Sequence, residues 1–356
     1  MSLESLIRTG TKVWLDGVDP EDVKRNRALG VSGATSNPSI ISEIIEKGRL
    51  DERINELIAQ GLDDEAIAWT LDDELVKSAQ EVFLPVWEST RGDDGYVSFE
   101  LDPLLEVEEE SGRLDRSERT RRYVKLGKQW AAGHRNRMIK VPATPAGINA
   151  LEELAAAGLT LNVTLMFTER QYRDAAEAIW RGAQRRRDGL KDFKSVYSIF
   201  ISRLDVYTGK RLGGTLSAAQ GQVGIAVAKR VWRANQEFWK GKPVRLKQEI
   251  VFASTGVKNP AEPPDKYVEA LAGSDIQTNP PATNDAVQRN EKIYTRNVDR
   301  PVAPDVDAEI VSRVDMNELE KTLLAEGTVK FIEPQNALLR LIAKKRTEAA
   351  AGVGRI

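Results

Sequence analysis

Eight short β-rich runs separated by helical patterns constrain the fold of this chain more than any other feature of its sequence. The runs are rich in β-branched and aromatic residues, and the longer stretches between them carry the periodicity of helices. They lie at residues 12–16, 31–35, 96–101, 138–141, 160–167, 195–202, 249–254 and 275–279. Strands that alternate with helices predict an α/β fold, and eight such units predict a (β/α)8 TIM barrel.

The helical stretches between these runs include 51–62, 168–189 and 216–241; the first two have acidic starts, and all three have basic or glycine ends. A length of 356 residues would allow two domains, but barrels of this kind commonly reach it as one unit. We find no internal repeat, low-complexity segment or long linker. We therefore expect a single barrel domain over residues 1–356 with additional helices, in which the segment from about residue 345 is a helix that frays into a tail.

The residue types that are missing from the chain exclude several kinds of chemistry. The chain has no cysteine and one histidine, His134, so thiol catalysis, disulfides and cysteine-ligated metals are excluded. A Ser-His-Asp triad would have to use His134, whose context, AAGHRNR, is typical of a solvated helix end and turn. We therefore expect carboxylates, lysine or tyrosine to carry any acid-base work, without a metal.

The balance of charge predicts a protein that binds neither nucleic acid nor membranes. The chain has 52 basic and 54 acidic residues, and it lacks an apolar run of 18 residues. Its N-terminus lacks the basic segment and apolar core of a signal peptide. We therefore expect a cytoplasmic protein, for which a homodimer is plausible on general grounds.

Lys140 lies in an otherwise apolar run, MIKVP, where a charged amine costs free energy unless it finds a partner or loses its proton. One interpretation is a lysine at a strand edge that discourages pairing between sheets. The other runs favour a different interpretation, because several of them alternate polar and apolar residues. In the run at 160–167, Leu161, Val163 and Leu165 share one face, whereas Thr160, Asn162 and Thr164 share the other.

Polar faces of this kind would converge inside a barrel. Enzymes with this fold hold their sites at the C-terminal ends of the strands. The candidate constellation there is Asp16, Asn37, Glu100, Lys140, Asn162 and Thr164. A lysine, two carboxylates, an amide and a hydroxyl fit Schiff-base chemistry on a carbonyl compound, because a neutral amine can attack the carbonyl while the polar groups handle protons.

Seven blocks of the sequence resemble the transaldolase family, in that family's order: WLDGV, GATSNPSII, VSFELDP, MIKVPATPAGINAL, LNVTLMF, SIFISRLD and FASTGVKNP. The resemblance covers nearly the whole chain and implies the same barrel. It implies that Lys140 forms the Schiff base and that Asp16 is the acid-base group on the ketose hydroxyl. Glu100 and Thr164 would hold the water that shuttles protons, and Asn37 and Asn162 would bind substrate hydroxyls.

The resemblance also implies a phosphate site made by Arg203 with the help of serine and lysine side chains, for which Ser254 and Lys258 are the candidates on the seventh strand. Ser198 and Phe200, in the same segment as Arg203, would be further substrate-binding residues. Guanidinium donors match phosphate oxygens in a fork, which makes the assignment physically reasonable. The alternatives are an ion pair of Arg203 with Asp205, an ordinary turn for Ser254 and Lys258, and a turn or helix-start role for Asn37.

The last strand departs from the family pattern, because Gln277, Asn279 and Pro281 stand where the family usually has Asn, Met and Glu. None of the proposed catalytic positions is lost. The expected activity is transfer of a dihydroxyacetone unit from fructose 6-phosphate or sedoheptulose 7-phosphate to an aldose phosphate, without cofactor or metal. One alternative is an aldolase that releases dihydroxyacetone, whose members tend to have tyrosine where this chain has Phe200. The other is a non-catalytic barrel that binds sugar phosphates.

Overall fold

The eight predicted strands form one closed parallel barrel in the computed structural model, which describes residues 2–107 and 114–353. Neighbours in the chain are neighbours in the barrel, and β1 closes it by pairing with β8. The strands are β1 (Lys12–Asp16), β2 (Gly33–Thr35), β3 (Val97–Glu100), β4 (Arg137–Pro142), β5 (Leu161–Met166), β6 (Ser195–Phe200), β7 (Glu249–Ala253) and β8 (Ile276–Asn279). The predicted TIM barrel is confirmed.

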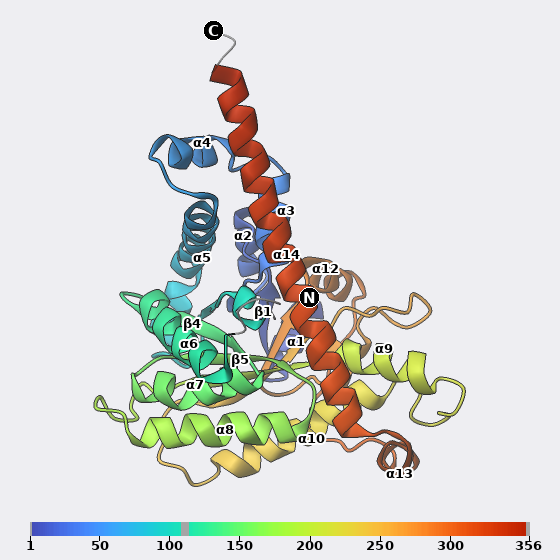
Figure 1. Ribbon diagram of the computed structural model, residues 1–356. Helices are drawn as coiled ribbons and strands as arrows, with labels where there is room; N and C mark the ends of the chain where they lie inside the picture. The colour runs from blue at the N-terminus through green and yellow to red at the C-terminus, as the bar shows by residue number, and fades with distance from the viewer. Residues whose placement is uncertain (1, 108–113, 354–356) are drawn as a thin grey trace.

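The helices surround this barrel (Figure 1). They are α1 (Ser2–Arg8), α2 (Pro20–Ala28), α3 (Pro38–Glu46), α4 (Asp51–Ala59), α5 (Asp64–Ser89), η1 (Pro103–Glu106), α6 (Arg116–Ala131), α7 (Pro145–Ala156), α8 (Glu169–Gln184), α9 (Ile201–Leu212), α10 (Val223–Trp239), α11 (Lys266–Ala270), α12 (Pro281–Arg289), α13 (Pro304–Arg313) and α14 (Met316–Val353). Side chains at Asp19, Asn37 and Thr144 cap helices whose first residue is proline, which suits a helix start. The helix expected over 216–241 starts only at Val223, after a turn. No helix in the described ranges is long and apolar enough to cross a membrane.

Helix α14 is the longest element and is drawn in red across the front of the barrel in Figure 1. It packs against α3, α5, α9 and η1, so it joins elements that are far apart in the sequence. The helix extends to Val353, and fraying from about residue 345 stays a prediction. Residues 354–356 of the expected tail lie outside the described residues.

One strand breaks the predicted alternation. The register between β5 and β6 shifts between Val163 and Met166, and Leu165 has a φ of 56°, in the left-handed region. A bulge of this kind redirects the side chains that follow it. Leu165 was expected to share a face with Leu161 and Val163, but its Cδ2 instead lies 3.1 Å from the position that a Cβ would occupy at Gly327 of α14. This part of the prediction is wrong, because the bulge turns Leu165 toward α14.

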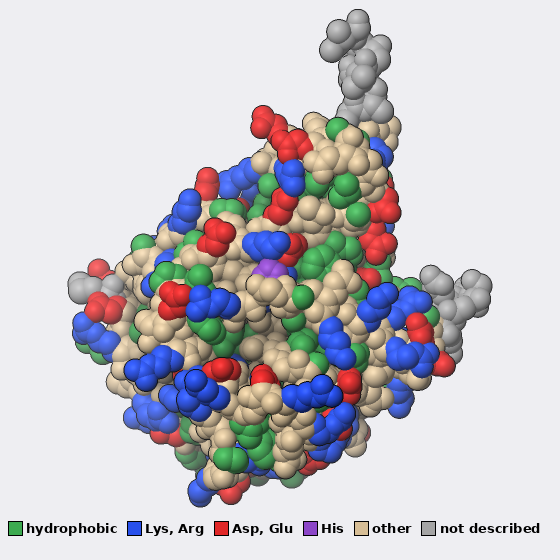
Figure 2. All heavy atoms as spheres, turned by 90° about the vertical axis from the view of Figure 1, so that its left-hand side faces the viewer, with side chains coloured by type: hydrophobic (Ala, Val, Ile, Leu, Met, Phe, Trp, Pro, Cys, Tyr) green, Lys and Arg blue, Asp and Glu red, His purple; other side chains and the backbone are tan. Residues whose placement is uncertain are grey.

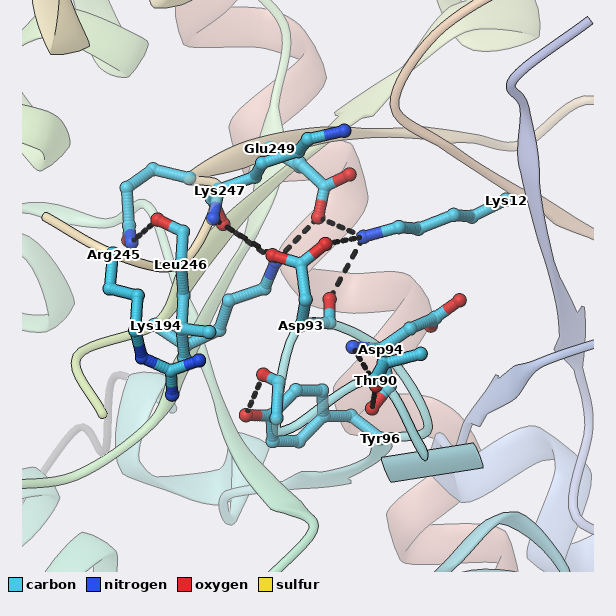
Figure 3. Close-up of polar contacts among 12 residues, drawn as sticks. Lys12, Thr90, Asp93, Asp94, Tyr96, Lys194, Arg245, Leu246, Lys247 and Glu249 are labelled. Carbon is cyan, nitrogen blue, oxygen red and sulfur yellow. Dashed lines mark hydrogen bonds and ion pairs between the residues drawn. The ribbon is translucent and has the colours of Figure 1, made fainter. Parts of the chain in front are cut away.

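Buried and partly buried ion pairs lie at the N-terminal end of the barrel (Figure 3). The Lys12 amine donates hydrogen bonds of 2.8 Å to both Asp93 Oδ2 and Glu249 Oε2, and Lys194 donates to Glu249 as well. Two cations thus face two carboxylates, so their charges compensate one another. Residues at this face of a TIM barrel usually serve stability, and the chemistry lies at the opposite end.

Asp72 on α5 is a buried carboxyl group outside the barrel, and it should make the stability of the protein depend on pH. Its carboxyl is buried, and its Oδ1 has no hydrogen-bond partner among the described residues. Burial raises its pKa from 3.8 to about 8, against the opposing charge of Arg137. The folded protein therefore binds this proton more tightly than the unfolded chain does. The stability that this adds is complete below about pH 4 and is lost as the pH rises through 8.

We expect Asp72→Asn, which keeps the shape but cannot ionise, to remove this dependence on pH. Between pH 5 and pH 7.5 the unfolding free energy of the wild type should fall relative to that of the variant by about 1.4 kcal/mol per pH unit. Urea unfolding curves of both proteins at several pH values would measure this difference. A constant difference would contradict the prediction, since it would mean that the carboxyl is already ionised in the folded state.

Candidate active site

A cavity of about 370 Å³ opens at the C-terminal end of the barrel and collects most of the predicted site residues. Nine of the eleven line it: Asp16, Asn37, Lys140, Thr164, Ser198, Phe200, Arg203, Ser254 and Lys258. The other two, Glu100 and Asn162, flank Lys140 on the neighbouring strands. His134 precedes β4, at the opposite end of the barrel, and its side chain is visible at the surface in Figure 2.

Lys140 is buried at the centre of this arrangement. Its Nζ donates hydrogen bonds of 3.1 Å to Glu100 Oε2 and to the carbonyl oxygen of Ser36. Because β4 pairs with strands on both sides, Lys140 has no sheet edge to protect. The strand-edge interpretation is therefore excluded, and the amine lies where a small carbonyl compound in the cavity can reach it.

Glu100 is the carboxylate that contacts this amine. Burial raises its pKa from 4.5 to about 7, although the nearby positive charge of Lys140 acts in the opposite direction. A carboxyl group with this pKa gains and loses a proton near neutral pH. Glu100 therefore has the properties of a group that exchanges protons with Lys140 or with a water beside it.

Asp16 ends β1 and is the second carboxylate of the site. Its burial raises its pKa, while the charges of Lys140, Lys258 and Arg203 act in the opposite direction. Thr35 Oγ1 donates a hydrogen bond of 3.2 Å to Asp16 Oδ1, which fixes the carboxylate at the cavity wall. Two carboxyls in different surroundings, one in contact with the amine and one at the wall of the same cavity, can take separate roles as acid and base.

Thr164 and Asn162 lie on β5, and they differ in whether their polar atoms are free to bind a ligand. Thr164 Oγ1 lines the cavity and is buried without a hydrogen-bond partner among the described residues, so it can bind a water or a substrate oxygen. Asn162 Nδ2 instead donates to Ser98 Oγ at 2.9 Å, and Asn162 Oδ1 accepts from Ser198 Oγ at 2.7 Å. Asn162 does not line the cavity, and its contacts orient Ser198, which does.

Asn37 has the helix-start role that we considered for it, and it also lines the cavity. Its Oδ1 accepts a hydrogen bond of 3.2 Å from the backbone nitrogen of Ile40 and so caps α3. An amide has two further donors on its nitrogen. The cap therefore fixes the side chain without using the groups that a substrate oxygen would contact.

Arg203 lies in the first turn of α9, directly after β6. Its Nη1 is buried without a hydrogen-bond partner among the described residues, and its guanidinium carbon lies 5.0 Å from the centre of the Phe200 ring. Asp205 accepts instead from the backbone nitrogen of Gly224 and from Tyr267 Oη, each at 2.8 Å. These contacts contradict the alternative that Arg203 forms an ion pair with Asp205.

Ser254 and Lys258 lie beside Arg203 on the same wall of the cavity. Ser254 follows β7 with a φ of 56°, and its Oγ lies 2.8 Å from Ser202 Oγ. Its left-handed backbone brings the hydroxyl toward the start of α9. The wall thus combines a guanidinium, an ammonium and a hydroxyl, which are groups that bind phosphate oxygens.

The sequence analysis missed the residues that α14 contributes. Lys330 and Phe331 line the cavity, and the Phe331 ring centre lies 5.5 Å from Lys140 Nζ. Helical periodicity alone does not tell which element a long helix will cover, so no signal pointed to these residues. Thr35 and Thr278 were also missed, although alternation in their strands could have found them; their hydroxyl oxygens lie 3.3 Å apart.

The unusual residues of β8 lie mostly away from the cavity. Gln277 Nε2 donates to the Val268 carbonyl at 3.0 Å, and Asn279 Oδ1 accepts from Thr255 Oγ1 at 2.7 Å. Only Pro281, at the start of α12, lines the cavity. Among the described residues, no group of three or more acidic or histidine side chains is arranged to hold a metal ion.

Comparisons with known proteins point to one family. The family model described as Transaldolase/Fructose-6-phosphate aldolase matches residues 13–342. The chain is 32% identical to a protein of Mycolicibacterium paratuberculosis named Transaldolase, over 98% of each chain. It is 32% identical to the Transaldolase of Mycobacterium tuberculosis and 30% identical to Transaldolase 2 of Streptomyces avermitilis, each over 95% of both chains.

Proposed function

The chain belongs to the transaldolase/fructose-6-phosphate aldolase family, and from this premise we propose that it is a transaldolase that works through a Schiff base on Lys140. The donor is a ketose phosphate such as fructose 6-phosphate or sedoheptulose 7-phosphate, and the acceptor is an aldose phosphate. One observation carries the proposal. A buried amine lies 3.1 Å from a carboxyl group with a pKa of about 7, in a cavity that Asp16 also lines.

Imine formation is the first stage. The neutral Lys140 amine adds to the ketone carbon C2 of the donor and gives a carbinolamine, and loss of its hydroxyl as water gives the protonated imine. This loss needs a proton on the leaving oxygen. Glu100 supplies it, directly or through a water held by Thr164, because its pKa near 7 allows it to donate at neutral pH.

Bond cleavage and transfer follow. Asp16 removes the proton of the C4 hydroxyl, the C3–C4 bond breaks, and its electron pair moves to C3 as the imine becomes an enamine. The first aldose phosphate leaves as an aldehyde. The enamine then adds through C3 to the aldehyde carbon of the acceptor, Asp16 returns its proton to the new hydroxyl, and hydrolysis of the imine releases the new ketose phosphate.

Phe200 supports transfer over simple release of dihydroxyacetone. Release without an acceptor requires a proton to reach C3 of the enamine. Phe200 lines the cavity beneath Arg203 and offers no hydroxyl that could supply this proton. We therefore expect the enamine to last longer than it would beside a tyrosine at this position, which favours its reaction with an acceptor aldehyde.

A product assay tests the proposed function. The enzyme is incubated with fructose 6-phosphate, with and without erythrose 4-phosphate, and the products are identified by mass spectrometry. We expect glyceraldehyde 3-phosphate and sedoheptulose 7-phosphate only when the acceptor is present. Equal glyceraldehyde 3-phosphate without acceptor would show an aldolase, and binding without any product would show a non-catalytic barrel.

Arg203→Ala tests the phosphate site. A charge-assisted contact contributes about 1.5 to 3 kcal/mol, so we expect kcat/KM for fructose 6-phosphate to fall roughly 10- to 150-fold, mainly through KM. Unphosphorylated fructose should be affected little, because it has no group for the guanidinium to bind. Steady-state kinetics with both substrates would measure this. Equal losses for both substrates would mean that Arg203 supports the structure rather than the phosphate.

A further inference from the structure

We infer that Lys330 of α14 binds the substrate phosphate together with Arg203 and Lys258, so that the helix across the barrel mouth completes the phosphate site. The inference rests on the proposed function and extends it to a residue outside the barrel itself. Lys330 lines the catalytic cavity and also a second cavity of about 400 Å³ beside α9. Arg203, Ser254 and Lys258 line both cavities too, so these residues mark the place where the two meet.

The position of Lys330 is fixed by its neighbours on α14. Gly327, one turn earlier, brings the helix backbone close to the site, since a Cβ there would lie 3.4 Å from Arg203 Nη1. Phe331, the next residue, is buried against the Lys140 amine. Leu323 lines the second cavity on the same face of the helix. The contacts on both sides of Lys330 therefore hold its backbone at the rim of the catalytic cavity.

The charges of the cavity wall indicate what this lysine binds. Apart from Lys140, which reacts as a neutral amine, three basic side chains line the catalytic cavity (Arg203, Lys258 and Lys330), against two acidic ones (Asp16 and Glu43). These three cations suit a phosphate monoester, which has a charge near −2 at neutral pH. Lys330 forms no hydrogen bond or ion pair with another described residue. Its ammonium group is therefore available to a ligand.

A matched pair of variants tests this assignment. Lys330→Met removes the charge and keeps the length of the side chain, and Lys321→Met does the same at an exposed position of α14 that lines neither cavity. Because the Lys330 side chain is exposed, we expect a moderate effect: a rise in KM for fructose 6-phosphate and erythrose 4-phosphate of about 3- to 30-fold, with kcat nearly unchanged. Lys330→Arg should keep most of the wild-type affinity, and Lys321→Met should match the wild type.

Direct binding of inorganic phosphate separates this inference from the proposed function. Calorimetric titration with phosphate needs no turnover, and we expect the dissociation constant to rise about 3- to 30-fold in Lys330→Met alone. If the wild type fails the transfer assay, the proposed function falls, whatever the titration shows. If the wild type transfers but Lys330→Met behaves like Lys321→Met in both experiments, the assignment of Lys330 is overturned. Equal losses of activity by Lys330→Met with phosphorylated and unphosphorylated donors would also overturn it. They would indicate that Lys330 helps to close the cavity over any substrate rather than to bind the phosphate.

Discussion

Lys140→Met should be inactive, with turnover reduced by about 10⁴-fold or more, because the variant has no amine to form the imine. Reduction of the wild type with borohydride in the presence of fructose 6-phosphate should attach a three-carbon, dihydroxyacetone-derived group to the peptide that contains residue 140. The variant should show no such adduct. Peptide mass spectrometry of the reduced samples would measure both results.

Lys140→Arg is the matched control for charge. It keeps a cation beside Glu100, but a guanidinium remains protonated and cannot form the imine, so this variant should be as inactive as Lys140→Met. Thermal unfolding would show that both variants are folded. An adduct that persists undiminished in Lys140→Met, or appreciable turnover by Lys140→Arg, would contradict the assignment of Lys140 as the nucleophile.

The barrel could be predicted because its information is local and repeated. Each strand is a short β-rich run, and the prediction of β1 as Lys12–Asp16 matches the structure at both ends. The β5 bulge at Leu165 was not predicted, because no local pattern marks it and the side chain that it redirects packs near Gly327, 162 residues later in the chain. The path of α14 across the barrel could not be predicted either. Helical periodicity shows that a face is buried, but not which distant elements bury it.

The site could be predicted in so far as it lies on strands. Alternation places Asp16, Lys140 and Thr164 on inward faces, and all three line the cavity. The sequence could not show that Asn162 would use its amide on Ser98 and Ser198, because those contacts depend on the relative positions of three strands. It also could not show that Lys330 would reach the site from α14. Contacts between elements that are distant in the sequence determine which atoms Asn162 contacts and where Lys330 lies. No local sequence pattern reveals such contacts.

Asp16→Asn is expected to separate the two halves of the reaction. The amide cannot accept the C4 hydroxyl proton, so cleavage and transfer should slow by about 10²- to 10⁴-fold, typical of the loss of a general base. Imine formation should remain, since Glu100 still contacts the Lys140 amine. Borohydride reduction with fructose 6-phosphate should therefore trap the intact hexose phosphate on residue 140, where the wild type carries the three-carbon group.

Glu100→Gln is the contrasting variant, because the loss of this carboxyl should slow imine formation itself. In the wild type, the rate of imine formation should change with pH near 7, where Glu100 gains and loses its proton, and Glu100→Gln should lose that dependence. Rapid-quench borohydride reduction at several pH values would measure the rate of imine formation in the wild type and in Glu100→Gln.

If Asp16→Asn traps only the three-carbon adduct, C3–C4 cleavage does not need the Asp16 carboxylate. The base would then have to be another group at the cavity wall, and Glu43 is the remaining carboxylate there.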